Sequence, residues 1–230
     1  MSVIIPVHDI KKTQNCIKAL NKQTYEKIEI IKVDFKGFPA EKRNYGFEKS
    51  HGNFILFLDE DEYLSPETIH ECVKKARQGY DIVAIPVRKK VDKGYALQSL
   101  AVIRENTVKT MFFKKKVLLD IGLFDPRFIF CDDIEIRERA LSREYRIGMI
   151  EHGYMLHDEN VTVKSIIQKT ILTRRPFREL RSKYGEQAFQ RIVRPSFHRR
   201  RIVKELLIRP KYIFGVLFIM STRAIIRRIP

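Results

Sequence analysis

The sequence lacks tryptophan and contains three cysteines, none of them paired as C-x-x-C. Neither a disulfide framework nor a zinc site is indicated, and a reducing compartment is the simpler expectation. A long apolar run is also missing. Residues 212–222 form an uncharged stretch of 11 residues, whereas a membrane-spanning helix needs about 20. The N-terminus opens directly into a strand-like run, so no signal peptide is expected.

Acidic residues are scarce in the last third of the chain. Residues 161–230 contain 18 Lys and Arg against 3 Asp and Glu, whereas residues 1–160 contain 27 against 25. The net charge of +17 is therefore concentrated near the C-terminus. Such asymmetry indicates a polyanionic partner, either nucleic acid or an anionic membrane surface. We expect one domain at 1–160 and a basic, partly apolar helical extension at 161–230.

Strands and helices alternate in the first part. Apolar runs at 3–7, 28–33, 54–58 and 81–87 predict strands, and the segments between them have helical spacing. This order predicts an α/β fold, with a mostly parallel sheet flanked by helices. Residues 88–106 are polar and irregular, which predicts a loop on the substrate side.

Four consecutive carboxylates, residues 59–62, follow the strand at 54–58. The carboxyl ends of strands are where open α/β sheets bind ligands. Carboxylates at i and i+2 can share one hard divalent cation, and such a cation suits a substrate diphosphate. A solvated acidic turn before a helix is the other interpretation of these residues taken alone.

Further fragments occur in a fixed order along the chain. They are Gln23-Thr24-Tyr25, Glu29-Ile30-Ile31-Lys32-Val33-Asp34, Lys42-Arg43-Asn44-Tyr45-Gly46, Phe57-Leu58-Asp59-Glu60-Asp61, Gly122-Leu123-Phe124-Asp125 and Cys131-Asp132-Asp133-Ile134-Glu135. With these fragments the sequence resembles the family-2 glycosyltransferases of the GT-A (Rossmann-like) fold over roughly residues 2–160. The resemblance implies inverting transfer of a sugar from a nucleotide diphosphate donor. Such transfer needs a divalent metal, Mn²⁺ or Mg²⁺, on the leaving group and a base on the acceptor.

The resemblance also implies metal ligands. Asp61 is expected to bind the metal directly, and Asp59 to contact the ribose or the metal. Glu60 is the variable middle residue on the donor side. His157 follows the last sheet strand, where such enzymes often place a third metal ligand, although a plain surface or core histidine is the alternative. Glu62 is expected to be a solvated or helix-side carboxylate.

The resemblance implies that Asp133 is the general base, and neighbouring carboxylates are expected to raise the pKa of one member of this acidic cluster. Asp132 and Glu135 are expected on the acceptor side, where Asp132 would orient the acceptor and Glu135 could also brace the following helix. Without the resemblance, the cluster would be interpreted as an acidic helix start stabilised by the helix dipole. Cys131 is expected to pack rather than to act as a nucleophile.

Other residues are expected to hold the nucleotide sugar. Pro6, Val7 and Asp9 lie where the first strand ends, which in the family holds the base and ribose, and Asp34 is expected to hydrogen-bond the base. The family's second Asp after this position is missing, so UDP- and GDP-sugars both remain open. Arg43 is expected to approach the donor phosphates, or else to be a surface arginine.

The basic C-terminal part is expected to lie on an anionic membrane surface as an interfacial segment. The enzyme would then be peripheral to the cytoplasmic face of the cell membrane, with a polyprenyl-linked lipid or a glycan as acceptor. A helix that covers the sheet or forms a homodimer is the alternative. Other functions are a binding-only GT-A-like module, a nucleotidyltransferase and a nucleic-acid-binding protein. Nucleic acid is disfavoured because no recognised binding motif occurs and the acidic cluster would go unexplained.

Overall fold

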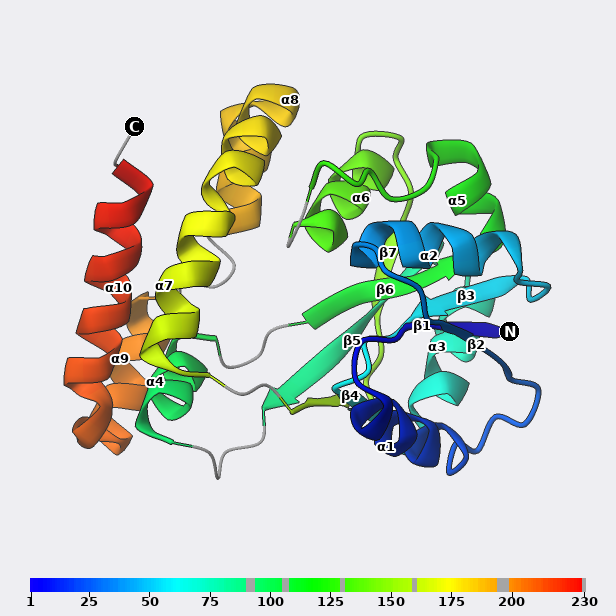
Figure 1. Ribbon diagram of the computed structural model, residues 1–230, viewed down its shortest axis with the longest axis horizontal. Helices are drawn as coiled ribbons and strands as arrows, with labels where there is room; N and C mark the ends of the chain where they lie inside the picture. Colours follow the sequence, from blue (N-terminus) through cyan, green and yellow to red (C-terminus); the bar gives the residue numbers. More distant parts are fainter. Residues whose placement is uncertain (90–93, 105–107, 129–130, 159–160, 194–198, 229–230) are drawn as a thin grey trace. The chain divides into compact units, whose positions relative to one another are not determined.

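The computed structural model describes residues 1–89, 94–104, 108–128, 131–158, 161–193 and 199–228 (Figure 1). The chain forms two compact units. The first comprises Met1–Arg88 and Val108–Asp158, and the second comprises Lys89–Thr107 and Glu159–Pro230. The segment Lys89–Thr107, from the middle of the chain, thus groups with the C-terminal helices. A single division of the chain after residue 160 would assign this segment to the first unit.

The first unit is a sheet with helices. Its strands are β1 (Ser2–Pro6), β2 (Glu29–Val33), β3 (Phe54–Phe57), β4 (Glu62–Leu64), β5 (Ile82–Lys89), β6 (Val108–Lys114), β7 (Ile147–Met149) and β8 (Met155–His157). Its helices are α1 (Ile10–Leu20), α2 (Pro39–Glu48), α3 (Thr68–Arg77), α5 (Lys115–Ile121) and α6 (Asp132–Leu141). The strand order is β2-β1-β3-β6-β5-β8-β4, and β7 also pairs with β5. The sequence pattern did not predict the short strands β4 and β8.

The sheet is mixed rather than mostly parallel. β1 runs parallel to β2 and β3, and β5 to β7, but β6 is antiparallel to both β3 and β5. A parallel neighbour needs a crossover connection, usually a helix on the sheet. The helix between β5 and β6 is α4 (Tyr95–Arg104), which belongs to the second unit. The chain therefore returns antiparallel, and the expected loop at 88–106 contains a helix.

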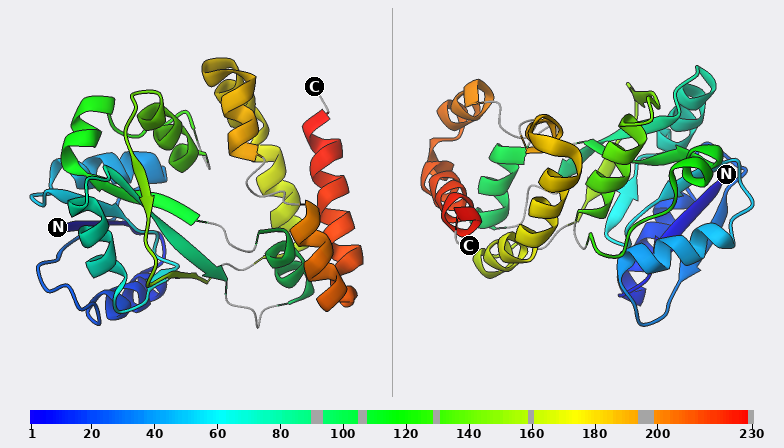
Figure 2. Two further views of the ribbon diagram at one scale, coloured as in Figure 1. Left: turned by 180° about the vertical axis from the view of Figure 1, so that it is seen from behind. Right: turned by 90° about the horizontal axis from the view of Figure 1, so that it is seen from above.

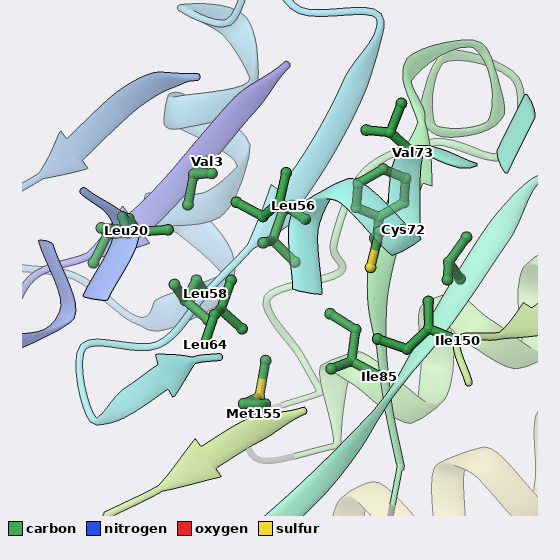
Figure 3. Packing of buried hydrophobic residues seen from close by; sticks show 14 of the residues in the cluster. Val3, Leu20, Leu56, Leu58, Leu64, Cys72, Val73, Ile85, Ile150 and Met155 are labelled. Atoms are coloured by element: carbon green, nitrogen blue, oxygen red, sulfur yellow. The ribbon is translucent and has the colours of Figure 1, made fainter. Parts of the chain in front are cut away.

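Apolar side chains fill both faces of this sheet. On one face α1 and α3 cover β1 and β3, where Val3, Leu20, Leu56 and Cys72 are buried in one cluster (Figure 3). On the other face α2, α5 and α6 cover a second cluster that includes Ile4. Figure 2 shows these elements from two further sides. Neighbouring residues of β1 thus serve opposite faces, as the pleat of a strand requires.

The second unit is helical. Its elements are α4, α7 (Val163–Leu172), α8 (Arg174–Val193), α9 (Arg199–Ile208), the 3-10 turn η1 (Pro210–Tyr212) and α10 (Ile213–Arg228). α8 is kinked at Gly185, where φ is +80°, a conformation that glycine adopts without strain. α10 packs against α4 and α7 around a small core with Leu100, Ile166, Val216 and Ile219. In the described parts of the chain, the helices are all too short or too polar to cross a bilayer.

The packing of α2 on β1 gives a first prediction. A Cβ on Gly46 would come within 2.4 Å of Ile4 Cγ2, so we expect Gly46→Ala to push the helix off the sheet. Overpacking of this kind costs about 1–3 kcal/mol. Each kcal/mol lowers the melting midpoint of a chain of this size by about 2–4 °C, which circular dichroism would detect. Glu48→Ala, an exposed change in the same helix, is the control, and equal midpoints for the two variants would contradict this packing.

Candidate active site

A buried arginine on α2 lies at the centre of the site. The Nη2 atom of Arg43 is 2.6 Å from Asp59 Oδ1, in the acidic motif that follows β3. Its Nη1 atom donates to Oδ2 of Asp132, in the first turn of α6. The side chain is 5% exposed and lies over the ring of Phe124, with Cζ 5.4 Å from the ring centroid. One arginine therefore connects two acidic motifs that are far apart in the sequence.

This arrangement differs from the expected contact of Arg43 with donor phosphates. Both terminal nitrogens of its guanidinium already face carboxylates, a pairing that the planar group suits well. Burial opposes the charge of Arg43, but the charges of Asp59 and Asp132 outweigh it and raise the pKa of the guanidinium. Arg43 is thus a permanent counter-ion within the site, and a direct phosphate contact stays a prediction.

A second cation, Lys109 of β6, enters the same network. Its Nζ atom lies 2.7 Å from Asp59 Oδ2 and 2.5 Å from Glu62 Oε1. The other oxygen of Glu62 accepts a hydrogen bond from the Asp59 amide, and Glu62 is only 2% exposed. The expectation of a solvated Glu62 is therefore wrong, because β4 buries this side chain. Sequence reasoning missed Lys109, since a single lysine at a strand start forms no local motif.

Burial and charge set the protonation of these carboxyl groups in opposite ways. Burial opposes the ionisation of Asp59, but the charges of Arg43 and Lys109 outweigh it and hold the pKa of this carboxyl well below its usual range. For Glu62 and Asp132 burial dominates and raises the pKa. The network thus combines one firmly ionised carboxylate with two that bind protons more readily than usual.

Asp61 and His157 lie together at the rim of this network. The antiparallel pairing of β4 with β8 sets Glu62 opposite His157 and brings Nε2 of His157 to 3.6 Å from Asp61 Oδ2. Both side chains are 24% exposed, so they can be reached from solvent. Among the described residues, no group of three or more His, Cys, Asp and Glu side chains could hold a metal. A carboxylate and an imidazole nevertheless fit a divalent cation that takes its other ligands from a diphosphate and water.

The acidic cluster of α6 divides into groups with different surroundings. Asp132 is 9% exposed and is held by Arg43. Asp133 is half-buried, and its Oδ1 accepts a hydrogen bond of 2.9 Å from the Ile134 amide. Glu135 is 1% exposed and forms a 2.6 Å ion pair with Arg139. Glu135 therefore braces α6 from within the protein, and Asp133 is the more accessible carboxylate.

The turn after α5 is fastened to the same helices. The side-chain amide of Asn44 donates to the Phe124 carbonyl at 2.8 Å and accepts from the Phe124 amide at 2.9 Å. Arg139 donates to the carbonyl of Ile121, the last residue of α5, and to the carbonyl of Leu123 in this turn. Since the ring of Phe124 lies against Arg43, these contacts help to fix the guanidinium in position.

The expected donor-side residues meet at one edge of the sheet. β1, β2 and β3 are parallel, so Asp9, Asp34 and Asp59 all follow carboxyl ends at that edge. Pro6 closes β1 opposite Val33, and Asp34 is exposed. This is the edge at which open α/β sheets bind ligands.

The loop after β1 is held by two further side chains. Glu60 Oε2 accepts hydrogen bonds from the amides of His8 and Asp9, at 2.6 and 2.8 Å. The buried Lys42 donates from Nζ to the Val7 carbonyl at 2.5 Å. Asp9 caps α1 by accepting from amides of its first turn. In this structure Glu60 and Asp9 shape the loop, and their expected contacts with a nucleotide sugar stay predictions.

The comparison with known families agrees with this geometry. Residues 36–145 match the model of the family described as Glycosyl transferase family 2. This part of the chain is therefore similar to the domains of that family. Among curated proteins, the chain is similar to the uncharacterized glycosyltransferase EpsJ of Bacillus subtilis (strain 168). The two are 24% identical over 210 residues, which cover 70% of this chain and 61% of EpsJ, so the chain spans less than two thirds of that relative.

Solved structures share the fold. The crystal structure of S. aureus TarS superposes with a TM-score of 0.53 at 18% identity, covering 76% of this chain and 39% of TarS. TarS 1-349 in complex with UDP gives 0.52 at 17% identity, covering 76% and 64%. The complex with UDP-GlcNAc gives 0.54 at 16% identity, covering 76% and 66%. The expected GT-A fold is thus confirmed, with a mixed sheet in place of a mostly parallel one.

The buried network gives a second prediction. Lys109→Met would leave Asp59 and Glu62 close together without the cation between them, and breaking a buried ionic group costs about 3–5 kcal/mol. We expect a clearly lower melting midpoint for this variant. Lys109→Met/Glu62→Gln should recover part of the loss, because it removes one uncompensated charge. Lys116→Met, an exposed change on α5, is the control. An unchanged midpoint for Lys109→Met would show that the network does not stabilise the fold.

Proposed function

We propose that the first unit transfers a sugar from a nucleoside diphosphate donor to an acceptor oxygen, in a single displacement with inversion. The family 2 match and the GT-A fold support this class of reaction. The observation that carries the proposal is the position of Asp61 and His157 beside Asp59, which Arg43 joins to the acidic start of α6. Groups suited to a leaving diphosphate and to an acceptor proton are thereby held in one network.

The donor we propose is a UDP-sugar, with a GDP-sugar as the alternative to be tested. The structural neighbour TarS 1-349 has been solved with UDP and with UDP-GlcNAc, which favours uridine. In this chain the loops after β1 and β2 lie at the same edge as the acidic motif. Asp34 is exposed there and could accept a hydrogen bond from the base.

We infer that Asp61 and His157 bind a divalent metal together with the donor. When bound, such a cation neutralises negative charge on the departing diphosphate. Asp61 supplies a carboxylate oxygen, and His157 supplies the neutral form of its imidazole. The two oxygens of Asp59 each face a cationic side chain, so we assign Asp59 to the ribose side and to the positioning of Arg43 and Lys109.

Asp133 acts as the base in this proposal. It takes the proton of the acceptor hydroxyl as that oxygen attacks the anomeric carbon, while the bond from this carbon to the diphosphate oxygen breaks. Asp132 is held by Arg43 and fixes the first turn of α6, from which Asp133 projects.

We propose a polyprenyl-linked lipid or a glycan as acceptor, at the cytoplasmic face of the membrane. The three free, buried cysteines are compatible with such a reducing compartment.

Donor binding tests the metal ligands. A ligand that binds only the folded state raises the free energy of unfolding, by about 2.7 kcal/mol at a concentration one hundred times its Kd. The melting midpoint rises with it. We expect UDP with Mn²⁺ to raise the midpoint more than UDP or Mn²⁺ alone, and Asp61→Ala and His157→Ala to abolish this metal-dependent part. Glu67→Gln, an exposed change on the same unit, is the control. A wild-type protein that responds to no nucleotide diphosphate would contradict the proposed donor class.

Turnover tests the base. Asp133→Asn should lower the release of UDP from a UDP-sugar by about 10²–10⁴-fold, the usual contribution of a general base, while the midpoint shift with UDP and Mn²⁺ persists. Glu151→Gln, at an exposed carboxylate of the same unit, should leave release unchanged. Near-normal release by Asp133→Asn would refute the base assignment. Binding of UDP without any release, in wild type and with all acceptors tried, would favour a binding-only module.

A further inference from the structure

Helix α10 is apolar on two opposite sides. Val216 and Ile219 are each 1% exposed and belong to the core of the second unit. Phe214, Leu217 and Phe218 are 78%, 53% and 45% exposed. At about 3.6 residues per turn, the exposed set lies opposite the buried set. A helix that is apolar all round is normally buried on all sides, so we expect a partner to cover the outer side of α10.

The end of α9 also carries exposed apolar residues. Leu207 and Ile208 are 78% and 63% exposed, and the short turn η1 connects them to the start of α10. The apolar corner is the set Leu207, Ile208, Phe214, Leu217 and Phe218. Exposed apolar groups gathered in this way mark a contact with another protein or with a membrane.

Basic side chains border the apolar corner. Lys204 and Lys211 are exposed, and Arg209 lies between the last residue of α9 and η1. The chain from 161 to 230 has 18 Lys and Arg against 3 acidic residues. Arg209 lies 3.9 Å from Glu205, measured from Nε to Oε2, but a neutral protein partner would leave most of the basic excess unmatched. A nucleic acid backbone would leave the apolar side chains uncovered. An anionic lipid surface matches both features.

The second unit also contains a hollow beside η1 that could take a lipid phosphate. It has a volume of about 530 Å³ and is lined by Gln98, Arg209, Lys211 and Tyr212, together with apolar side chains. The Tyr95 hydroxyl donates to the Lys211 carbonyl at 2.7 Å and so ties this turn to α4. Two cations, a side-chain amide and an apolar wall suit a phosphate group that is attached to a hydrocarbon chain.

We propose that the apolar corner inserts into the interfacial layer of a bilayer of anionic phospholipids, while Arg209 and Lys211 bind lipid phosphate. α10 has 16 residues and is therefore about 24 Å long, shorter than the roughly 30 Å hydrocarbon core, so it lies in the surface. The proposal depends on the second unit alone. It would stand even if the first unit proved to transfer no sugar.

The lack of tryptophan in the sequence permits a direct test of insertion. Phe214→Trp places a single tryptophan in the apolar corner. We expect its emission to shift to shorter wavelength with vesicles of phosphatidylcholine and phosphatidylglycerol, but not with phosphatidylcholine alone. Leu119→Trp, at a residue of the first unit that is 68% exposed, is the matched control and should show no shift. An unshifted Phe214→Trp spectrum with anionic vesicles would overturn the proposal.

Co-sedimentation with the same vesicles measures the energetic contributions. Leu207→Ser/Phe214→Ser should lower the partition coefficient by about tenfold or more per side chain, the effect of exposing a buried Leu or Phe. Leu119→Ser should not change it. Arg209→Gln/Lys211→Gln should lower it about fivefold per charge and weaken its dependence on salt, whereas Lys36→Gln/Lys116→Gln, two exposed lysines of the first unit, should have a smaller effect.

Two other results would also reject the membrane partner. If light scattering found a dimer that Leu207→Ser/Phe214→Ser dissociates, and vesicle binding did not change, the apolar corner would be an interface between two copies. If single-stranded RNA bound as tightly as anionic vesicles and only the charge variant weakened both, the surface would be a general polyanion site. Because none of these measurements uses a sugar donor, their failure is distinct from failure of the proposed transfer reaction.

Discussion

The ion pairs of Arg43 with Asp59 and Asp132 are the interaction on which the candidate site depends. They connect α2, the end of β3 and the start of α6. These three segments are far apart in the sequence, so contacts between near neighbours in the chain cannot position them. Removing the arginine would leave the buried carboxylate of Asp132 without its partner, and breaking a buried pair in this way is strongly destabilising. The neighbouring Asn44 fastens the Phe124 turn, so α2 helps to position both the two acidic motifs and this turn.

The balance of charge within this network has a chemical consequence. Three acidic groups, Asp59, Glu62 and Asp132, share two cations, Arg43 and Lys109, which leaves one negative charge uncompensated when all are ionised. Burial raises the pKa of Glu62 and Asp132, and the neighbouring carboxylate of Asp59 adds to this effect. The uncompensated charge also means that Arg43 and Lys109 are not available to neutralise a diphosphate. A divalent cation at Asp61 and His157 would supply that positive charge, and this is the reason that we propose a metal-dependent reaction.

Local patterns in the sequence predicted the elements but not the long-range partners. The apolar runs located β1, β2, β3 and β5, and the ordered motifs indicated the GT-A fold, because both depend on near neighbours in the chain. The antiparallel placement of β6 could not be read in this way, since it follows from α4 packing in the second unit. Lys109 and the burial of Glu62 were missed for the same reason. Asp61 and His157 were both expected in the site, but their separation of 3.6 Å depends on the pairing of two short strands that no pattern indicated.

The C-terminal helices also show what a local sequence pattern cannot decide, namely which apolar residues are buried. The sequence left two interpretations of the C-terminal part, a segment that lies on a membrane surface and a helix that covers the sheet or forms a homodimer. The structure divides the uncharged stretch at 212–222 by exposure, with Val216 and Ile219 in the core and Phe214 and Leu217 outside it. The buried face therefore holds the helix in its own unit, and the exposed face is the part for which we propose a lipid surface. A helix with two apolar faces can pack in its own unit with one face and contact a lipid surface with the other. Such a contact buries an apolar face in the interfacial layer without crossing the bilayer.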